Sequence, residues 1–181
     1  TKAITSLAVL MLWEEGKFFL DDPISKYIPA FAETGILDEF NTKDSTYTTT
    51  LPKNKMTIRH LLTHTSGIGY GEIDGNTAIR SIYLKRGLRD IFAPDQTMEE
   101  VTNAIAAQPI HHEPGERFTY SLGLDVLGHF VELMSGMSFP EFLKTRVFEP
   151  LDMKDTYFTL PEEKHGRLVP VLTRDGEQWA V

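Results

Sequence analysis

Hydrophobic residues follow helical spacing over most of the chain, starting with its first residues. Residues 3–13 are almost continuously apolar, a pattern typical of a helix that is buried on most sides, and Gly16 is placed to end it. Later stretches combine apolar residues three and four apart with capping residues such as Thr57 and Thr97. Further helices are therefore predicted over residues 22–28, 57–66, 78–83, 97–107, 124–136 and 138–147.

The remaining stretches predict little sheet. Residues 33–54 have too little apolar periodicity to pack and are predicted to be loop, although 47–51 could form a short edge strand. Residues 69–75 form a turn region. Near the end, the apolar runs 168–172 and 178–181 lie on either side of Asp175-Gly176, which is a hairpin signal. The chain is expected to be mainly helical.

Composition narrows the class of protein. A chain of 181 residues with 41% hydrophobic and 24% charged residues is large enough for one soluble globular domain with a real core. The formal net charge is −8 and the basic residues are scattered, which argues against nucleic acid or an anionic membrane surface as a partner. There is no cysteine, so disulfides, zinc-thiolate sites and a cysteine nucleophile are excluded. The apolar run at 3–13 is too short to span a bilayer.

Three stretches carry motifs, in the same order as in a known superfamily. They are residues 1–23, the segment Leu61-Leu62-Thr63-His64-Thr65-Ser66-Gly67, and the segment Pro114-Gly115-Glu116-Arg117-Phe118-Thr119-Tyr120-Ser121. Together they resemble the serine β-lactamase and penicillin-binding-protein superfamily. The resemblance is to the branch with class C β-lactamases, D-amino-acid-releasing peptidases and β-lactamase-like esterases. Residues 147–156 add a weaker match to the same branch.

The resemblance implies a catalytic role for two residues. The nucleophile motif of the superfamily is Ser-x-x-Lys, so if Lys2 is the motif lysine, the serine belongs two positions before Thr1. Tyr120 matches the active-site tyrosine of the third motif. A serine hydroxyl needs a base within hydrogen-bond reach, and a serine three residues before Lys2 would share its helix face. We therefore expect Lys2 and Tyr120 to form the general-base pair of an acyl-transfer site.

The surroundings of the lysine should favour this role. Burial among Ala3, Ile4 and Leu7 would disfavour the charged amine and help Lys2 to accept a proton. The resemblance implies that the oxyanion hole comes from the nucleophile and from a late strand. Neither is expected within this chain.

The fold that the resemblance implies is α+β, of the β-lactamase/transpeptidase-like type. This chain would be a mainly α fragment of it, a single partial domain from which most of the antiparallel sheet is missing. Its expected parts are a nucleophile helix and a short helix (1–32), a loop (33–55), a helical subdomain (56–155) and the start of the return to the sheet (156–181). Without the sheet the first helix would expose an apolar face, so self-association through that face is expected. The fragment alone is expected to be catalytically inactive.

The substrate expected for the parent protein is a small-molecule ester. Many members of the superfamily have an asparagine where this chain has Leu122, in the substrate-binding position, and leucine cannot hydrogen-bond an amide substrate. This shifts the expectation from a β-lactam or peptide towards a carboxylic ester, with no metal and no organic cofactor. A β-lactamase, a penicillin-binding D-amino-acid peptidase and a non-catalytic binding module on the same fold stay as alternatives.

Other polar residues have plainer interpretations. His60 and His64 have the spacing of a metal pair but lack the glutamate of the His-Glu-x-x-His motif, so a buried His64 that holds the following turn is favoured. Residues 111–113 are interpreted as a solvated turn rather than a ligand set. Ser66 lacks the Gly-x-Ser-x-Gly context of a nucleophile. His165-Gly166 follows Tyr120 too soon to be the missing third motif.

Overall fold

The computed structural model describes residues 2–88, 96–170, 173–175 and 178–180. The chain forms two compact units, Thr1–Leu143 and Lys144–Val181. Each unit is described by itself below. Among the described residues, no helix combines the length and the hydropathy needed to cross a bilayer.

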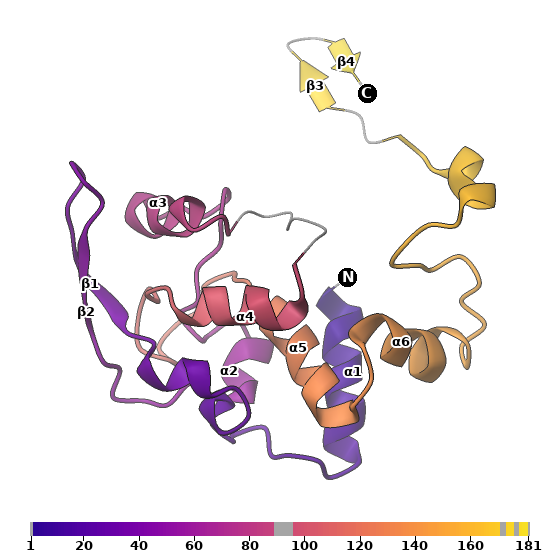
Figure 1. Cartoon of the computed structure of the whole chain (residues 1–181), viewed down its shortest axis with the longest axis horizontal. Coiled ribbons are helices and arrows are strands. Elements are labelled where there is room, and N and C mark those ends of the chain that lie inside the picture. The colour runs from indigo at the N-terminus through magenta and orange to yellow at the C-terminus, as the bar shows by residue number, and fades with distance from the viewer. Residues whose placement is uncertain (1, 89–95, 171–172, 176–177, 181) are drawn as a thin grey trace. The chain divides into compact units, whose positions relative to one another are not determined.

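The first unit is built around one central helix. Its helices are α1 (Lys2–Glu14), α2 (Ile58–Leu62), α3 (Thr77–Lys85), α4 (Met98–Ala106), α5 (Gly123–Ser135) and α6 (Phe139–Leu143), with 3-10 turns η1 (Ile24–Lys26) and η2 (Pro29–Glu33). Helix α5 contacts α1, α2, α4 and α6, and Figure 1 shows α1 lying beside it. Seven of its apolar or glycine positions and His129 are buried, as expected for a helix with neighbours on several sides. The mainly helical character predicted from the sequence is confirmed.

Capping residues set the ends of several helices. Thr57 and Thr97 each accept a hydrogen bond from the backbone N–H three residues later, and the side chains of His60 and Glu100 return the contact to the cap. Helix α5 ends at Gly136, whose φ of +72° favours glycine. These ends were readable from the sequence. The helix after Thr57 nevertheless stops at Leu62, because His64 adopts a left-handed conformation with φ of +55°.

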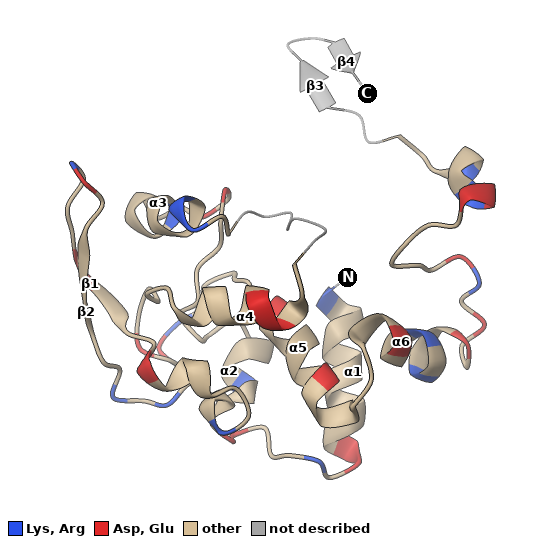
Figure 2. Cartoon of the chain, viewed as in Figure 1, with Lys and Arg blue, Asp and Glu red and all other residues tan. Residues whose placement is uncertain are grey.

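Helix α1 is less buried than its composition predicts. Figure 2 shows no charged residue between its first turn and its last. Its buried residues are Thr5, Ala8, Val9 and Leu12, which face the core. Leu7, Leu10 and Trp13 are exposed on another side of the helix. The prediction of a helix buried on most sides is wrong for this structure, and the apolar face that was expected to be exposed is present.

The predicted loop at 33–54 contains a β-hairpin. Strands β1 (Ile36–Phe40) and β2 (Tyr47–Thr50) pair antiparallel, with an irregularity in register before Phe40. The backbone of β1 also bonds to Ile110, since Leu37 N–H donates to the Ile110 carbonyl at 2.9 Å. The threonine-rich strand lacks apolar alternation but has the β-branched side chains that suit a pleated strand. The edge strand predicted at 47–51 is thereby confirmed, whereas the loop around it was too broad a prediction.

The second unit is small and open. It contains a π-helical turn η3 (Lys144–Phe148), a 3-10 turn η4 (Glu162–Arg167) and the antiparallel strands β3 (Thr173–Asp175) and β4 (Gln178–Ala180). The hairpin expected around Asp175-Gly176 is present, but its first strand begins after the predicted run 168–172. Residues 171–172, 176–177 and 181 of that prediction lie outside the described residues.

Candidate active site

Lys2 and Tyr120 meet where the first turns of two neighbouring helices lie close together. Lys2 is the first residue of α1, and Tyr120 lies three residues before α5. The Lys2 Nζ is 4.8 Å from the centroid of the Tyr120 ring and donates a hydrogen bond to the Ser121 carbonyl at 3.3 Å. The contact joins residues 118 positions apart in sequence. The proximity predicted for these two side chains is thus present, and their catalytic role stays a prediction.

The ammonium group of Lys2 faces a carbonyl oxygen and two aromatic rings. It donates a hydrogen bond to the Ser121 carbonyl and lies over the faces of the Tyr70 and Tyr120 rings, which attract cations. These contacts hold the ammonium group beside the Tyr120 ring.

The burial expected around Lys2 is found only in part, since Ile4 is half-buried. Lys2 is half-buried, but Ala3 and Leu7 are exposed. The reason is the exposed face of α1, to which both residues belong.

His64 lies beside the pair and supports Tyr120. Its ring centroid is 5.0 Å from that of Tyr120, and its Nδ1 accepts a hydrogen bond from the Ser121 N–H at 3.2 Å. Burial lowers the pKa of His64, and the positive charge of Lys2 lowers it further. A neutral imidazole that accepts at Nδ1 fits this environment. The prediction of a buried His64 that holds the following turn is wrong in detail, because His64 is half-buried and its side chain contacts Ser121 instead.

Asp125 is a half-buried acid on the first turn of α5. Burial raises the pKa of its carboxyl group, while the nearby charge of Lys2 acts in the opposite direction. Its Oδ2 is buried and has no hydrogen-bond partner among the residues that the structure describes. The sequence analysis did not identify this residue. An acidic residue in the first turn of a helix is ordinarily a favourable surface feature, so its burial beside Lys2 had no sequence signal.

Tyr70 is a second residue that the sequence analysis missed. Its ring stacks on that of Tyr120 with a centroid distance of 5.3 Å and an interplanar angle of 3°. The Lys2 Nζ lies 5.5 Å from the Tyr70 centroid, so the cation faces both rings. The only available signal was an aromatic residue within the glycine-rich turn at 69–75, and that signal alone does not indicate a site.

A small cavity of about 180 Å³ borders the two tyrosines. It is lined by Tyr70, Ile73, Asp74, Gly75, Thr119 and Tyr120. Tyr120 is 46% exposed, so its ring is accessible from solvent. A small molecule in this cavity can therefore contact the Tyr120 ring.

Leu122 does not lie at the surface of this site. Its side chain has 0% exposure and belongs to the core, at the N-terminal end of α5. A side chain without exposed surface cannot contact a substrate. The predicted substrate-binding position of Leu122 is therefore corrected to a packing position, because the turn into α5 directs this residue inward.

The other histidines of the motifs have structural partners. The His60 Nδ1 accepts from the Thr57 N–H, and a Cβ on Gly115, with φ of +90°, would come within 3.0 Å of the His60 ring. His112 is 3% exposed, and its Nε2 lies 2.8 Å from the Thr119 Oγ1. The interpretation of residues 111–113 as a solvated turn is therefore wrong. The polarity of these residues did not indicate that the His112 side chain packs beneath the segment before Tyr120.

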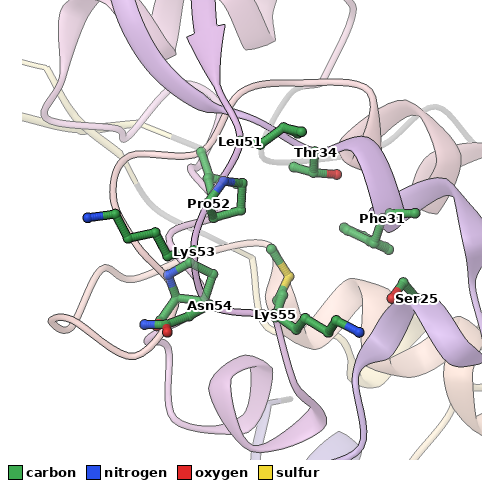
Figure 3. Close-up of a pocket in the computed structure, with 12 residues that line it drawn as sticks. Ser25, Phe31, Thr34, Leu51, Pro52, Lys53, Asn54 and Lys55 are labelled. Atoms are coloured by element: carbon green, nitrogen blue, oxygen red, sulfur yellow. The ribbon is translucent and has the colours of Figure 1, made fainter.

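A second cavity lies away from these residues. Figure 3 shows it between Phe31, Thr34, Leu51 and Pro52, with a volume of about 310 Å³. None of the residues that line it is Lys2, Tyr70 or Tyr120. Its chemistry offers two lysines and a mainly apolar wall, without an acid or a base placed as a pair. The Lys2–Tyr120 cluster is therefore the stronger candidate site.

The architecture defines the class of protein. The chain is a mainly helical fragment of the β-lactamase/transpeptidase-like fold. Its central helix α5 is buried, Lys2 lies at the start of the neighbouring helix α1, and Tyr120 lies just before α5. A family model described as beta-lactamase matches residues 1–181. The chain belongs to the beta-lactamase family.

Comparisons with individual proteins agree with this assignment. The chain is 35% identical to esterase EstB of Burkholderia gladioli over 97% of its own length and 43% of that protein. It is similar to the structure of EstCE1, a hydrolase with promiscuous acyltransferase activity, with 29% identity and a TM-score of 0.68 over 83% of this chain and 36% of that one. A variant of simvastatin synthase from Aspergillus terreus, 24% identical, shares the fold with a TM-score of 0.79 over 99% of this chain and 41% of that chain. The chain spans about two fifths of the length of the curated relatives it matches.

Proposed function

We propose that the protein to which this chain belongs is a serine hydrolase that cleaves carboxylic esters through an acyl-enzyme. The observation that carries the proposal is the contact of the Lys2 ammonium with the Tyr120 ring at 4.8 Å. Two relatives whose names describe an esterase and a hydrolase with acyltransferase activity support it. In this proposal Lys2 and Tyr120 share the general-base role.

The proposed reaction has two steps. In the first, the oxygen of a serine two positions before Thr1 bonds to the ester carbonyl carbon, and its proton passes to the Lys2–Tyr120 pair. The pair then returns this proton to the alcohol oxygen as the bond between carbonyl carbon and alcohol breaks. In the second step the pair takes a proton from a water molecule, whose oxygen bonds to the carbonyl carbon of the acyl-enzyme. The pair then returns this proton to the serine oxygen as the bond between that oxygen and the carbonyl carbon breaks. The products are the carboxylic acid and the regenerated serine.

The ester substrate class rests on two relatives, whose names describe an esterase and a hydrolase with acyltransferase activity, and on the surroundings of Tyr120. Leu122 is buried in the core, so it carries no argument about the substrate. The rings of Tyr70 and Tyr120 form part of the wall of the small cavity beside the phenol. Such a wall suits an ester with an apolar acyl or alcohol group.

The decisive test uses the chain expressed together with the residues that its gene encodes on both sides. Turnover of a chromogenic short-chain ester is expected, with little turnover of a chromogenic cephalosporin. Tyr120→Phe and Lys2→Met are each expected to lower kcat by about 100-fold or more, because general-base catalysis contributes that much. Matched controls are Tyr47→Phe in β2 and Lys17→Met after α1, which should retain the activity.

Each alternative has its own outcome. Cephalosporin turnover above ester turnover would favour the β-lactamase, and release of D-alanine from a peptide would favour the peptidase. Inertness toward all three substrates, with no serine codon two positions before Thr1, would overturn the proposal and favour a binding module. The 181-residue chain assayed by itself is expected to be inactive.

A further inference from the structure

Tyr70 lies on a loop that is anchored on both sides. Just before it, the Gly69 N–H donates to the hydroxyl oxygen of the fully buried Tyr83 at 3.1 Å. The Gly69 carbonyl accepts from the Leu122 N–H at 3.2 Å, which ties the loop to the start of α5. The backbone beside Tyr70 is thus fixed to the same turn that carries Tyr120.

The buried side chain of Asp74 anchors the other side of this loop. The Asp74 Oδ2 accepts a hydrogen bond from the Tyr70 N–H at 2.8 Å and lies 2.9 Å from the His111 Nε2. The Asp74 Oδ1 accepts from the Asn76 N–H at 2.8 Å. The side chains of Asp74 and His111 are only 4% and 10% exposed. A buried carboxylate with this many donors is held rigidly, and it holds the Tyr70 backbone in turn.

The ionisation of Asp74 agrees with this geometry. Burial alone would raise the pKa of its carboxyl group, but the hydrogen bonds from His111 and from the Tyr70 and Asn76 N–H groups bring the pKa below its usual value. The carboxylate form is therefore the one the loop is built around. It is the form that can accept all three contacts at once.

The loop has no spare room at its base. A Cβ on Gly69 would lie 2.5 Å from the Ile79 Cγ2 and 2.9 Å from the Asp74 Oδ2. Only glycine fits such a close approach. The Tyr70 side chain leaves this packed base and reaches the exposed Tyr120 ring, which it meets face to face.

We propose that Tyr70 is a positioning residue of the Lys2–Tyr120 pair, held in place by the buried Asp74–His111 contact. Tyr120 is 46% exposed and lies on a turn, so its ring needs a neighbour to fix its plane. A parallel ring supplies that neighbour and presents a second face to the Lys2 ammonium. The consequence for catalysis rests on the proposed function, whereas the positioning itself does not.

The positioning is tested on the 181-residue chain by NMR with ¹³C-labelled tyrosine rings. Tyr120→Phe assigns the Tyr120 signals. Tyr70→Ala is expected to move them, because it removes the ring current of a stacked neighbour, and Tyr70→Phe is expected to leave them nearly in place. Asp74→Asn and His111→Gln should move them in the same direction as Tyr70→Ala. Ile73→Ala is the matched control, since Ile73 lines the same cavity but is 61% exposed.

Two results would overturn the inference. One is an unchanged Tyr120 signal in Tyr70→Ala, and the other is an equal change in Tyr70→Phe and Tyr70→Ala. If Asp74→Asn or His111→Gln fails to fold by circular dichroism, the comparison of the two Tyr70 variants and Ile73→Ala still decides the role of Tyr70. A milder variant, His111→Asn, then tests the buried contact.

The catalytic consequence is measured in the chain with its encoded flanking residues. Tyr70→Ala is expected to lower kcat about 10-fold or more with a smaller change in KM and an altered pH profile, and Tyr70→Phe should restore both. A role in substrate binding alone would raise KM and leave kcat and the pH profile unchanged. If the unsubstituted protein hydrolyses no ester, the proposed function fails, but the NMR result still stands for or against the positioning.

Discussion

Helices α1 and α5 are equal in length and pack against each other, yet they are buried to different extents. Each has 13 residues, and α5 buries eight of them whereas α1 buries four. The difference lies in their neighbours, because α5 also contacts α2, α4 and α6. Leu7, Leu10 and Trp13 of α1 have no such cover and stay exposed.

The comparison teaches that apolar composition predicts a helix but not its burial. The site lies at the start of both helices. Lys2 comes from the half-covered helix and Tyr120 from the turn that leads into the covered one. A fully enclosed site would admit no substrate, and a fully exposed one would not hold two rings and an ammonium together. The half-buried Lys2 and the exposed Tyr120 ring meet both conditions.

The largest effect is expected at the buried centre of α5. Phe130 is fully buried and makes edge-to-face contacts with Phe18 at 4.8 Å and Tyr27 at 5.2 Å between ring centroids. Phe130→Ala removes both contacts and leaves a cavity, which is expected to lower the free energy of unfolding by about 3–5 kcal/mol. Urea denaturation followed by circular dichroism measures the change.

The matched control lies on the uncovered face of α1. Leu10 is 39% exposed, so Leu10→Ala is expected to change the free energy of unfolding by less than about 1 kcal/mol. Equal losses for Leu10→Ala and Phe130→Ala would contradict the unequal burial of the two helices.

Local signals in the sequence predicted much of this fold. The capping residues Thr57 and Thr97, and the glycine that ends α5, act within a few residues of the chain. Lys2 and Tyr120 were found through motif spacing, and the structure brings them together. The caps are encoded where they act, whereas the approach of Lys2 to Tyr120 was expected from the family resemblance.

Features that depend on distant contacts escaped the sequence. Tyr70 lies beside the site on a loop whose Asp74 contacts His111, 37 positions away in sequence. Leu122 was placed in the site by motif position, but the turn into α5 directs its side chain to the core. His112 is buried by its contact with Thr119, which polarity alone could not indicate. Tertiary packing decided all of these positions.

A second prediction concerns a feature that the two helices share. Gly16 after α1 and Gly136 after α5 both have φ of +72°, and a Cβ at either position would meet nothing within 4 Å. Gly16→Ala and Gly136→Ala should therefore each lower the free energy of unfolding by about 1–2 kcal/mol, the cost of a left-handed backbone for an L-residue. Thermal and urea unfolding check this.

Gly166→Ala, also in open space but without a positive φ, is the control and should change the free energy of unfolding little. Unequal losses at Gly16 and Gly136 would show that burial of the preceding helix matters at these caps.

The smallest expected effect has the opposite sign and distinguishes the first turns of the two helices. Burial raises the pKa of the Asp125 carboxyl group, and the charge of Lys2 acts against the rise. A raised pKa in the folded state means that the free energy of unfolding is highest below the usual pKa of the group. It decreases as the pH increases through the raised value. Above that value the native chain holds an ionised, partly unpartnered carboxylate. Asp125→Asn is therefore expected to raise the free energy of unfolding at pH 7 by about 1 kcal/mol, and the gain should vanish below pH 3.8.

Glu14→Gln on the exposed end of α1 is the control and should show no such pH dependence. Because the charge of Lys2 favours ionised Asp125, Lys2→Met should enlarge the gain from Asp125→Asn at pH 7. A gain that is the same with and without Lys2 would contradict the electrostatic coupling between the first turns of α1 and α5.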